Sequence, residues 1–204
     1  ITSLQIQLLA LRGIDSALQA HAFVHARLKE LPDPLLLPDM AKAVDRLLCA
    51  IRNGERIAVH GDYDVDGVSA TAVLYLALER AGAKVSYHIP LRLEDGYGIS
   101  ATALQEDAAA GVKVVVSVDC GISAMEEAAL AREYGIDLIV TDHHQPGDSL
   151  PAVYACVNPW LESSTFPYKP LCGAGVAFML VVALYGALRR QHKVPDGFDI
   201  RTLL

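Results

Sequence analysis

One stretch limits what this chain can fold into more than any other: residues 56–69, RIAVHGDYDVDGVS. It contains a short apolar run followed by a histidine and three aspartates at alternate positions, which are His60, Asp62, Asp64 and Asp66. The apolar run predicts a buried strand, and the apolar stretch after Gly67 predicts a helix. Carboxylates crowded at the end of a buried strand repel each other by roughly 4 kcal/mol per pair at about 4 Å and an effective dielectric of about 20. Hard divalent cations neutralise such a cluster, so the stretch predicts a metal site.

Two other interpretations compete with a dedicated metal site. An EF-hand calcium loop also begins D-x-D-x-D-G, but its twelfth position is a glutamate. Counted from Asp62, that position is Val73, inside an apolar helical run, so the EF-hand interpretation fails. Helix capping alone is the second alternative, and one aspartate would suffice for it.

Composition narrows the class of protein. The chain has 204 residues, of which 52% are hydrophobic, enough for one large α/β domain with a helical arm. The net charge of −7 argues against a broad basic surface for nucleic acid. Four widely spaced cysteines (Cys49, Cys120, Cys156 and Cys172) fit reduced thiols, so we expect a cytoplasmic protein. The chain begins at Ile1 without a signal-peptide pattern, which suggests a fragment or a processed chain.

The order of predicted elements indicates the fold class. Residues 4–30 and 39–53 are predicted to be helical, with three prolines between them, and residues 1–53 are expected to pack on the core as a helical lead-in. Residues 54–204 then alternate strands with helices. Strands are expected at 57–60, 84–89, 113–118, 137–141 and 152–157, and helices at 67–82, 100–110 and 122–134. This alternation predicts an α/β fold, a parallel sheet of about five strands with helices on both faces.

One apolar segment, 174–188, needs a comparison with membrane spans. It falls short of the ~20 residues that a spanning helix needs. It ends in Arg189 and Arg190, cations that suit the C-terminal end of a helix. We therefore expect a buried core helix and no membrane partner.

Polar clusters follow the predicted strands, where the sites of open parallel sheets gather. Asp119 follows VVVSV, and Asp142, His143 and His144 follow the next strand. A helix cap remains an alternative for Asp119, and two surface histidines remain one for the pair. Together with the first cluster, they suggest two divalent ions about 3.5–4 Å apart, a spacing that suits in-line attack on phosphorus. Oxygen ligands with one or two imidazoles favour Mn²⁺ or Mg²⁺.

The motifs VHGDYDVDG, VDCG and TDHH, in this order and spacing, resemble the DHH superfamily of phosphoesterases. Further stretches narrow the resemblance to the RecJ type, the bacterial 5′→3′ exonucleases specific for single-stranded DNA. These stretches are LPDPLLLPDMAKAV, PLRLEDGYG, VNP and LCGAGVAF. The resemblance extends from about Leu11 to Leu188.

The resemblance implies roles for individual residues. Asp64 and Asp66 each hold a metal, Asp119 bridges the two ions, and His143 is a further ligand. His60 completes the shell of the first metal, and Asp62 is an additional carboxylate that acts as a base near the site. His144 contacts the scissile phosphate, and Asp142 orients the two histidines.

The resemblance also implies a substrate loop, formed by Arg92, Gly96, Tyr97 and Gly98. Arg92 would bind a phosphate, and the glycines would allow close approach of the backbone. An ordinary surface arginine is the alternative. Gly173 and Gly175, before the long helix, would present N–H groups to an anion, although close helix–sheet packing explains them equally well.

The expected function is that of a two-metal 5′→3′ exodeoxyribonuclease core acting in DNA repair and recombination. Its expected partners are single-stranded DNA with a 5′ end, single-strand-binding protein and recombination helicases. The alternatives are another DHH phosphoesterase, acting on oligoribonucleotides or cyclic dinucleotides, and an inactive DHH scaffold. RecJ-type proteins carry a fourth aspartate motif, a second domain and an OB-type domain after the long helix. We expect these to be absent from this chain, whose own activity would then be weak.

Overall fold

The computed structural model describes residues 2–90, 98–194 and 199–203, and these form two compact units. The first unit, Ile1–Asp33, contains helices α1 (Ser3–Ala10) and α2 (Ala17–Val24) and a single 3-10 turn at Leu28–Glu30. Both helices begin with a capping box, from Thr2 with Gln5 and from Ser16 with Gln19. Gly13 has a left-handed φ of 74°, which explains why the predicted helix at 4–30 is broken into two.

The second unit, Pro34–Leu204, alternates strands and helices as predicted. Its strands are β1 (Arg56–His60), β2 (Lys84–His88), β3 (Val112–Val118), β4 (Asp137–Thr141) and β5 (Ala155–Val157). Its α-helices are α3 (Met40–Asn53), α4 (Val65–Arg80), α5 (Ala101–Ala109), α6 (Met125–Glu133) and α7 (Gly173–Arg190). Short 3-10 turns lie at Pro34–Leu36 and Ile200–Leu203. The division between units therefore falls after Asp33, and α3 belongs to the same unit as the sheet.

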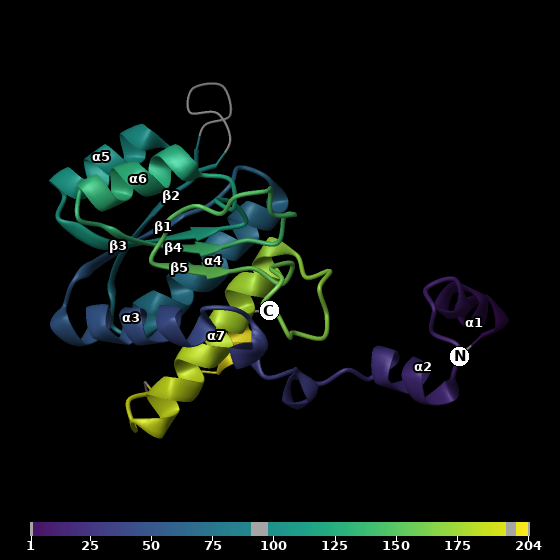
Figure 1. The fold of residues 1–204 in the computed structure, drawn as a ribbon. Coiled ribbons are helices and arrows are strands. Elements are labelled where there is room, and N and C mark those ends of the chain that lie inside the picture. Colours follow the sequence, from purple (N-terminus) through teal and green to yellow (C-terminus); the bar gives the residue numbers. More distant parts are fainter. Residues whose placement is uncertain (1, 91–97, 195–198, 204) are drawn as a thin grey trace. The chain divides into compact units, whose positions relative to one another are not determined.

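The five strands are all parallel and follow the order β2-β1-β3-β4-β5. Helices α5 and α6 cover one face of the sheet, and α3, α4 and α7 cover the other (Figure 1). The predicted class, a five-stranded parallel sheet between two helical layers, is confirmed. The strand order reverses direction between β1 and β3, and such a switch point opens a crevice at the carboxyl ends of the strands.

Residues of the central strands alternate between two apolar cores because both sheet faces are covered. Ile57 and Val59 of β1 lie in the core beneath α3, α4 and α7, while Ala58 lies in the core beneath α5 and α6. A strand buried on both faces has no room for charge along its length. The acidic side chains after β1, β3 and β4 therefore come where each of these strands ends.

Helix α7 is long and apolar enough to cross a membrane by length and composition alone, but 67% of that window is buried inside the fold. It packs against α3 and α4. Among the described residues, α7 therefore has the burial and the neighbouring helices expected of a core helix.

Candidate metal centre

Asp119 lies where β3 ends, in a backbone conformation that few residues adopt. Its φ is 62°, its N–H donates to the carbonyl of Thr141 at 3.0 Å, and it is 2% exposed. Aspartate and asparagine tolerate left-handed backbone better than most residues do. The turn places the Asp119 carboxylate over the carboxyl edge of the sheet, at the switch point.

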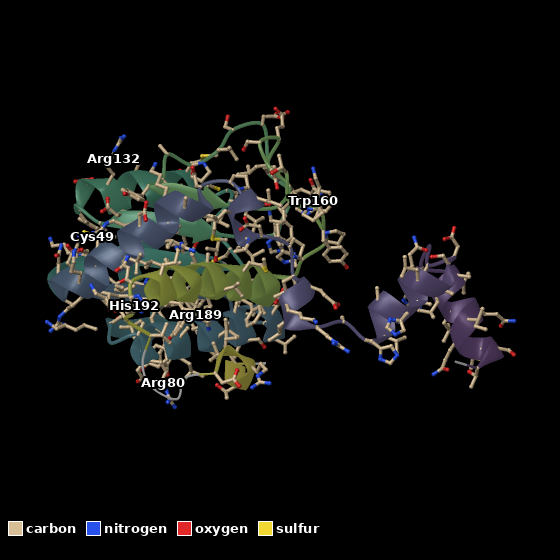
Figure 2. All side chains as sticks on the ribbon, turned by 90° about the horizontal axis from the view of Figure 1, so that it is seen from below. Cys49, Arg80, Arg132, Trp160, Arg189 and His192 are labelled. Carbon is tan, nitrogen blue, oxygen red and sulfur yellow. The ribbon has the colours of Figure 1, made fainter. Side chains whose placement is uncertain are left out.

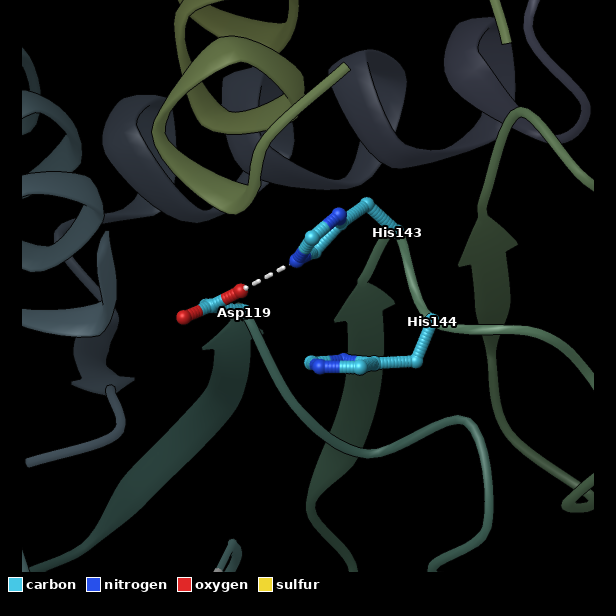
Figure 3. Close-up of side chains that lie close together, drawn as sticks. All are labelled: Asp119, His143 and His144. Atoms are coloured by element: carbon cyan, nitrogen blue, oxygen red, sulfur yellow. Dashed lines mark ion pairs between the residues drawn. The ribbon is translucent and has the colours of Figure 1, made fainter. Parts of the chain in front are cut away.

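His143 approaches Asp119 from the end of β4. Its Nε2 atom lies 3.0 Å from Oδ1 of Asp119 and 3.6 Å from Oδ2 of Asp66. Figure 3 shows the ring of His143 directed at the Asp119 carboxylate, with His144 beside it on the same loop. Asp66, Asp119 and His143 follow β1, β3 and β4, which are neighbours in the sheet. The three side chains meet at one point, as predicted.

Asp142 holds the loop that carries both histidines. Its Oδ1 accepts hydrogen bonds from the N–H groups of His143 at 2.7 Å and His144 at 3.1 Å, and it lies 2.7 Å from Nδ1 of His144. Its Oδ2 accepts from the N–H of Ile122 at 2.9 Å. Asp142 is 1% exposed, so a buried carboxylate fixes the His144 ring through Nδ1 and leaves Nε2 as its outward-facing nitrogen. This geometry fits the orienting role expected of Asp142.

The loop after β1 brings two further carboxylates to Asp119. Asp62 is buried, and Asp64 caps α4 by accepting from the N–H groups of Asp66 and Gly67 through Oδ1. Asp64 is therefore a helix cap. The alternative interpretation of this stretch, in which an aspartate caps the helix, is correct for Asp64. A β-carbon at Gly67 would lie 2.6 Å from backbone atoms of Asp62, so this tight loop requires glycine there.

Asp66 is bound by the first turn of α7. Its Oδ2 accepts from the N–H of Gly173 at 2.7 Å and its Oδ1 from the N–H of Ala174 at 2.8 Å. The positive end of a helix macrodipole stabilises a carboxylate in this position. A β-carbon at Gly173 would lie 2.2 Å from Oδ1 of Asp119, so α7 reaches the site only because residue 173 has no side chain.

The electrostatics of the site call for a cation. Burial, then the charges of Asp66 and Asp64, raise the pKa of Asp119 to about 7. Oδ1 of Asp119 is buried and accepts no hydrogen bond from the described residues, because its contact with His143 lacks hydrogen-bond geometry. A buried polar atom without a partner is costly. A divalent ion would satisfy it and neutralise the neighbouring carboxylates.

The carboxylates of the site also shift the pKa of His144. Partial burial would lower the pKa of this imidazole, but the hydrogen bond to Asp142 and the charges of Asp142, Asp119 and Asp62 outweigh it and raise the pKa. A raised pKa extends the protonated ring to higher pH, and a cationic ring suits contact with a phosphate.

The potential metal ligands form two groups that share Asp119. Within each group, ligand atoms lie within 4.8 Å of one another: one contains Asp62, Asp64 and Asp119, and the other Asp119, His143 and His144. Oxygen-rich ligands with imidazole fit Mn²⁺ or Mg²⁺ rather than a thiolate-type ion. The acidic and imidazole side chains present can therefore hold metal ions, and Asp119 is where two ions would meet.

His60 is buried, and its Nδ1 atom has no hydrogen-bond partner among the described residues, so this nitrogen is available for the ligand role that the resemblance implied. Its Nε2 lies 2.7 Å from Oδ2 of Asp107 on α5, its ring packs against His88, and it is 1% exposed. Among the described residues, neither His60 nor Asp66 belongs to the two ligand groups, whereas Asp62, expected to act as a base, belongs to one. A carboxylate on one ring nitrogen commonly orients a histidine whose other nitrogen binds metal, so the ligand role of His60 stays a prediction.

The expected substrate-binding residues are only partly visible. Arg92, Gly96 and Tyr97 lie outside the described residues, and Gly98 has a left-handed φ of 88°. The N–H of Gly173 donates to Asp66 and that of Gly175 donates to Sγ of Cys172 at 3.3 Å. Close packing therefore accounts for Gly173, while the capping bond from Cys172 occupies the N–H of Gly175.

Two residues that the structure shows to support the site had not been predicted. Asn158, 0% exposed, donates from Nδ2 to the carbonyl of His144 at 2.9 Å. Asp107 is the partner of His60. The helical spacing of Asp107 after Ala103 and Leu104, both buried, is a signal that could have revealed an acid on the sheet side of α5.

A comparison with family models decides the affiliation. Residues 56–200 match the model described as the DHH family, N-terminal domain. The chain belongs to the DHH family. The match begins at β1 and so includes every strand-end residue of the candidate metal centre.

Among curated DHH relatives, the chain is similar to two proteins named single-stranded-DNA-specific exonuclease RecJ. It is 43% identical over 188 residues to that of Bacillus subtilis (strain 168), which covers 92% of this chain and 24% of the relative. It is 44% identical over 198 residues to that of Escherichia coli (strain K12), covering 97% of this chain and 33% of the relative. The chain thus spans a quarter to a third of the length of these relatives.

Solved structures of the same kind share the fold. A crystal structure of exonuclease RecJ bound to manganese is 42% identical, with a TM-score of 0.69, over 74% of this chain and 38% of that one. RecJ from Thermus thermophilus in complex with Mn²⁺ is 36% identical, with a TM-score of 0.67, over 90% of this chain and 26% of that one. Both structural matches agree with the α/β fold and parallel sheet expected from the sequence.

Proposed function

We propose that this chain is the metal-dependent core of a 5′→3′ exonuclease that hydrolyses phosphodiester bonds in single-stranded DNA. The observation that carries the proposal is the sharing of Asp119 by two groups of potential ligands at the switch point of the sheet. The names of the RecJ relatives, single-stranded-DNA-specific exonucleases, support the substrate class. A place in DNA repair and recombination in the cytoplasm, with single-strand-binding protein and recombination helicases as partners, belongs to the same proposal.

Each side chain has a task in this reaction. Asp62, Asp64 and Asp119 would hold one divalent ion, and Asp119 and His143 would hold the other. Asp66, whose Oδ2 lies 3.6 Å from Nε2 of His143, would be the further carboxylate that the resemblance implies for this second ion. When bound, two such ions neutralise the carboxylates, polarise the phosphodiester and activate water. Asp142 keeps His144 in the orientation in which its outward nitrogen donates to a phosphate oxygen. Asn158 and the first turn of α7 hold the loops of His144 and Asp66 in place.

The test uses single strands labelled at either end, with Mn²⁺ or Mg²⁺, in the protein that carries this chain. The expected result is early release of the 5′ label as a mononucleotide, with duplex DNA resistant and the Asp119→Asn variant inactive. Preferential early loss of the 3′ label would contradict the polarity. Cleavage of cyclic dinucleotides or short oligoribonucleotides in preference to DNA would favour another DHH phosphoesterase. Retention of DNA binding with no cleavage under any metal would favour an inactive scaffold.

A further inference from the structure

The segment after β5 is tied to the loop of the candidate metal centre. Asn158 follows β5 directly, and its Nδ2 donates to the carbonyl of His144. Its Oδ1 accepts from the N–H of Trp160 at 2.8 Å. One buried asparagine side chain therefore connects the backbone of Trp160 to that of His144, so both have fixed positions relative to the site.

Buried residues on the same segment anchor the stretch of chain that carries Trp160. Leu161 is 6% exposed and Phe166 is 4% exposed, and these two side chains fasten the segment to the fold. Trp160 itself is half-buried, and Tyr168 nearby in sequence is 58% exposed. Nζ of Lys169 lies 5.8 Å from the centroid of the Trp160 ring. This distance is near the outer limit of about 6 Å for a cation–π contact, so a stacked ligand would displace the lysine easily.

Trp160 lies at the edge of the sheet that carries the metal centre. The helices run opposite to the strands, so their last turns, with Arg52, Arg80 and Arg132, lie at the edge where strands begin. Figure 2 shows Trp160 at the far end of the fold from Arg132 and Cys49. In a chain of net charge −7, Lys169 supplies a positive charge beside the Trp160 ring.

We infer that Trp160 is a stacking platform for a base of the single-stranded substrate, with Lys169 paired to an adjacent phosphate. The inference rests on the proposed function and assigns a substrate contact to it. An aromatic face binds any base because every base has a π-face, and a neighbouring cation follows the backbone, the combination typical of single-strand binding without sequence preference. An unpaired strand fits this surface, whereas a duplex hides its base faces within its own stack.

Trp160 is the single tryptophan of the chain, so its fluorescence reports on the platform directly. The experiment titrates the 204-residue chain with a fluorescein-labelled oligothymidylate in Ca²⁺, following anisotropy for binding and, with unlabelled oligonucleotide, tryptophan emission for stacking. The expected result is quenching of the emission with the same midpoint as the anisotropy. Blunt duplex of equal length should leave the emission unchanged.

Variants separate stacking from a structural role. Removing a stacked ring weakens binding about 5- to 150-fold per base, and for a half-buried ring we expect Trp160→Leu to weaken it about fivefold. Trp160→Phe should recover most of that loss, and Lys169→Gln should reduce the salt dependence of binding. Tyr87→Leu, which removes an aromatic ring that is 61% exposed on the edge strand β2, is the matched control and should bind like wild type.

The outcomes distinguish the inference from the proposed function. If wild type binds and cleaves single strands while emission stays constant and Trp160→Leu binds normally, the stacking platform does not exist and the proposed function stands. If the full protein that carries this chain neither binds nor cleaves single strands, the proposed function fails and the platform fails with it. Equal quenching by duplex and single strand would overturn the selectivity that the inference assigns to Trp160.

Discussion

A β-carbon added to Gly173 would lie 2.2 Å from Oδ1 of Asp119, closer than any real non-bonded contact. The N-terminus of α7 therefore packs directly against the carboxylate that both ligand groups share, while its N–H groups bind Asp66. The core helix and the metal centre are thus parts of one arrangement. A substitution at this contact should therefore change both the packing of the core helix and the binding of metal.

We expect Gly173→Ala to lower Mn²⁺ affinity and to reduce the free energy of unfolding by about 1–3 kcal/mol, because the added methyl group overpacks the site. Calorimetric Mn²⁺ titration and urea unfolding measure the two effects. Gly186→Ala in the same helix is the control, since a β-carbon there meets nothing closer than 3.8 Å and should stabilise by about 0.5–1 kcal/mol. Unchanged Mn²⁺ affinity in Gly173→Ala would mean that α7 can shift away from Asp119 without disturbing its carboxylate.

The raised pKa of Asp119 predicts how stability of the metal-free protein varies with pH. The folded state keeps the proton up to about pH 7, whereas the unfolded chain loses it near the ordinary pKa of an aspartate. The contribution of Asp119 is therefore fully present below the unfolded pKa and is lost as the pH rises through about 7. Thermal unfolding in EDTA should show a Tm that falls from about pH 4 to about pH 7 and that this group changes little at higher pH.

Asp119→Asn is the control for this pH dependence. Asparagine keeps the left-handed backbone at φ 62° and removes the charge, so the fall in Tm should shrink and the metal-free protein should be more stable at about pH 8. Asp119→Ala should be less stable than Asp119→Asn because alanine tolerates this backbone poorly. A pH dependence identical in wild type and Asp119→Asn would show that another group titrates.

The different contacts of Asp62 and His60 predict different effects of their substitution. Asp62→Asn removes a carboxylate from a ligand group and should weaken Mn²⁺ binding about tenfold or more. His60→Gln breaks the buried pair with Asp107 and should cost about 1–3 kcal/mol of stability. It should also weaken Mn²⁺ binding, because the resemblance implies that the unpartnered Nδ1 is a ligand. An Mn²⁺ affinity equal to that of wild type in His60→Gln would contradict that ligand role.

Asp142→Asn should damage the site without removing a proposed ligand. The asparagine amide can replace one carboxylate oxygen as acceptor, but its NH₂ group would then face either Ile122 N–H or the histidine N–H groups. A buried donor opposite a donor costs about 1–3 kcal/mol, and the pKa of His144 should fall as its carboxylate partner is lost. Urea unfolding measures the first effect and NMR titration of the His144 ring the second. If the pKa of His144 in Asp142→Asn equals that of wild type, the Asp142 carboxylate is not what raises it.

Much of this arrangement could be predicted from sequence because it follows from local patterns. Apolar runs joined by amphipathic helices dictate a parallel sheet, and polar residues after β1, β3 and β4 must then meet at one edge. The contacts that decide the details join distant segments: Asp66 with Gly173, His60 with Asp107, and His144 with Asn158. Spacing along the chain carries no information about such pairs. For the same reason the grouping of Asp62 with Asp64 and Asp119 could not be predicted from the sequence.

The central claim is that Asp119 joins two divalent ions, and electron paramagnetic resonance of the chain loaded with Mn²⁺ tests it most directly. Two Mn²⁺ ions bridged by one carboxylate at about 3.5–4 Å are exchange-coupled. We predict a coupled spectrum with two bound equivalents in wild type, and an uncoupled spectrum with no more than one equivalent in Asp119→Asn. A coupled spectrum that survives in Asp119→Asn, or a wild-type chain that never shows coupling at saturating Mn²⁺, would contradict this account of the site.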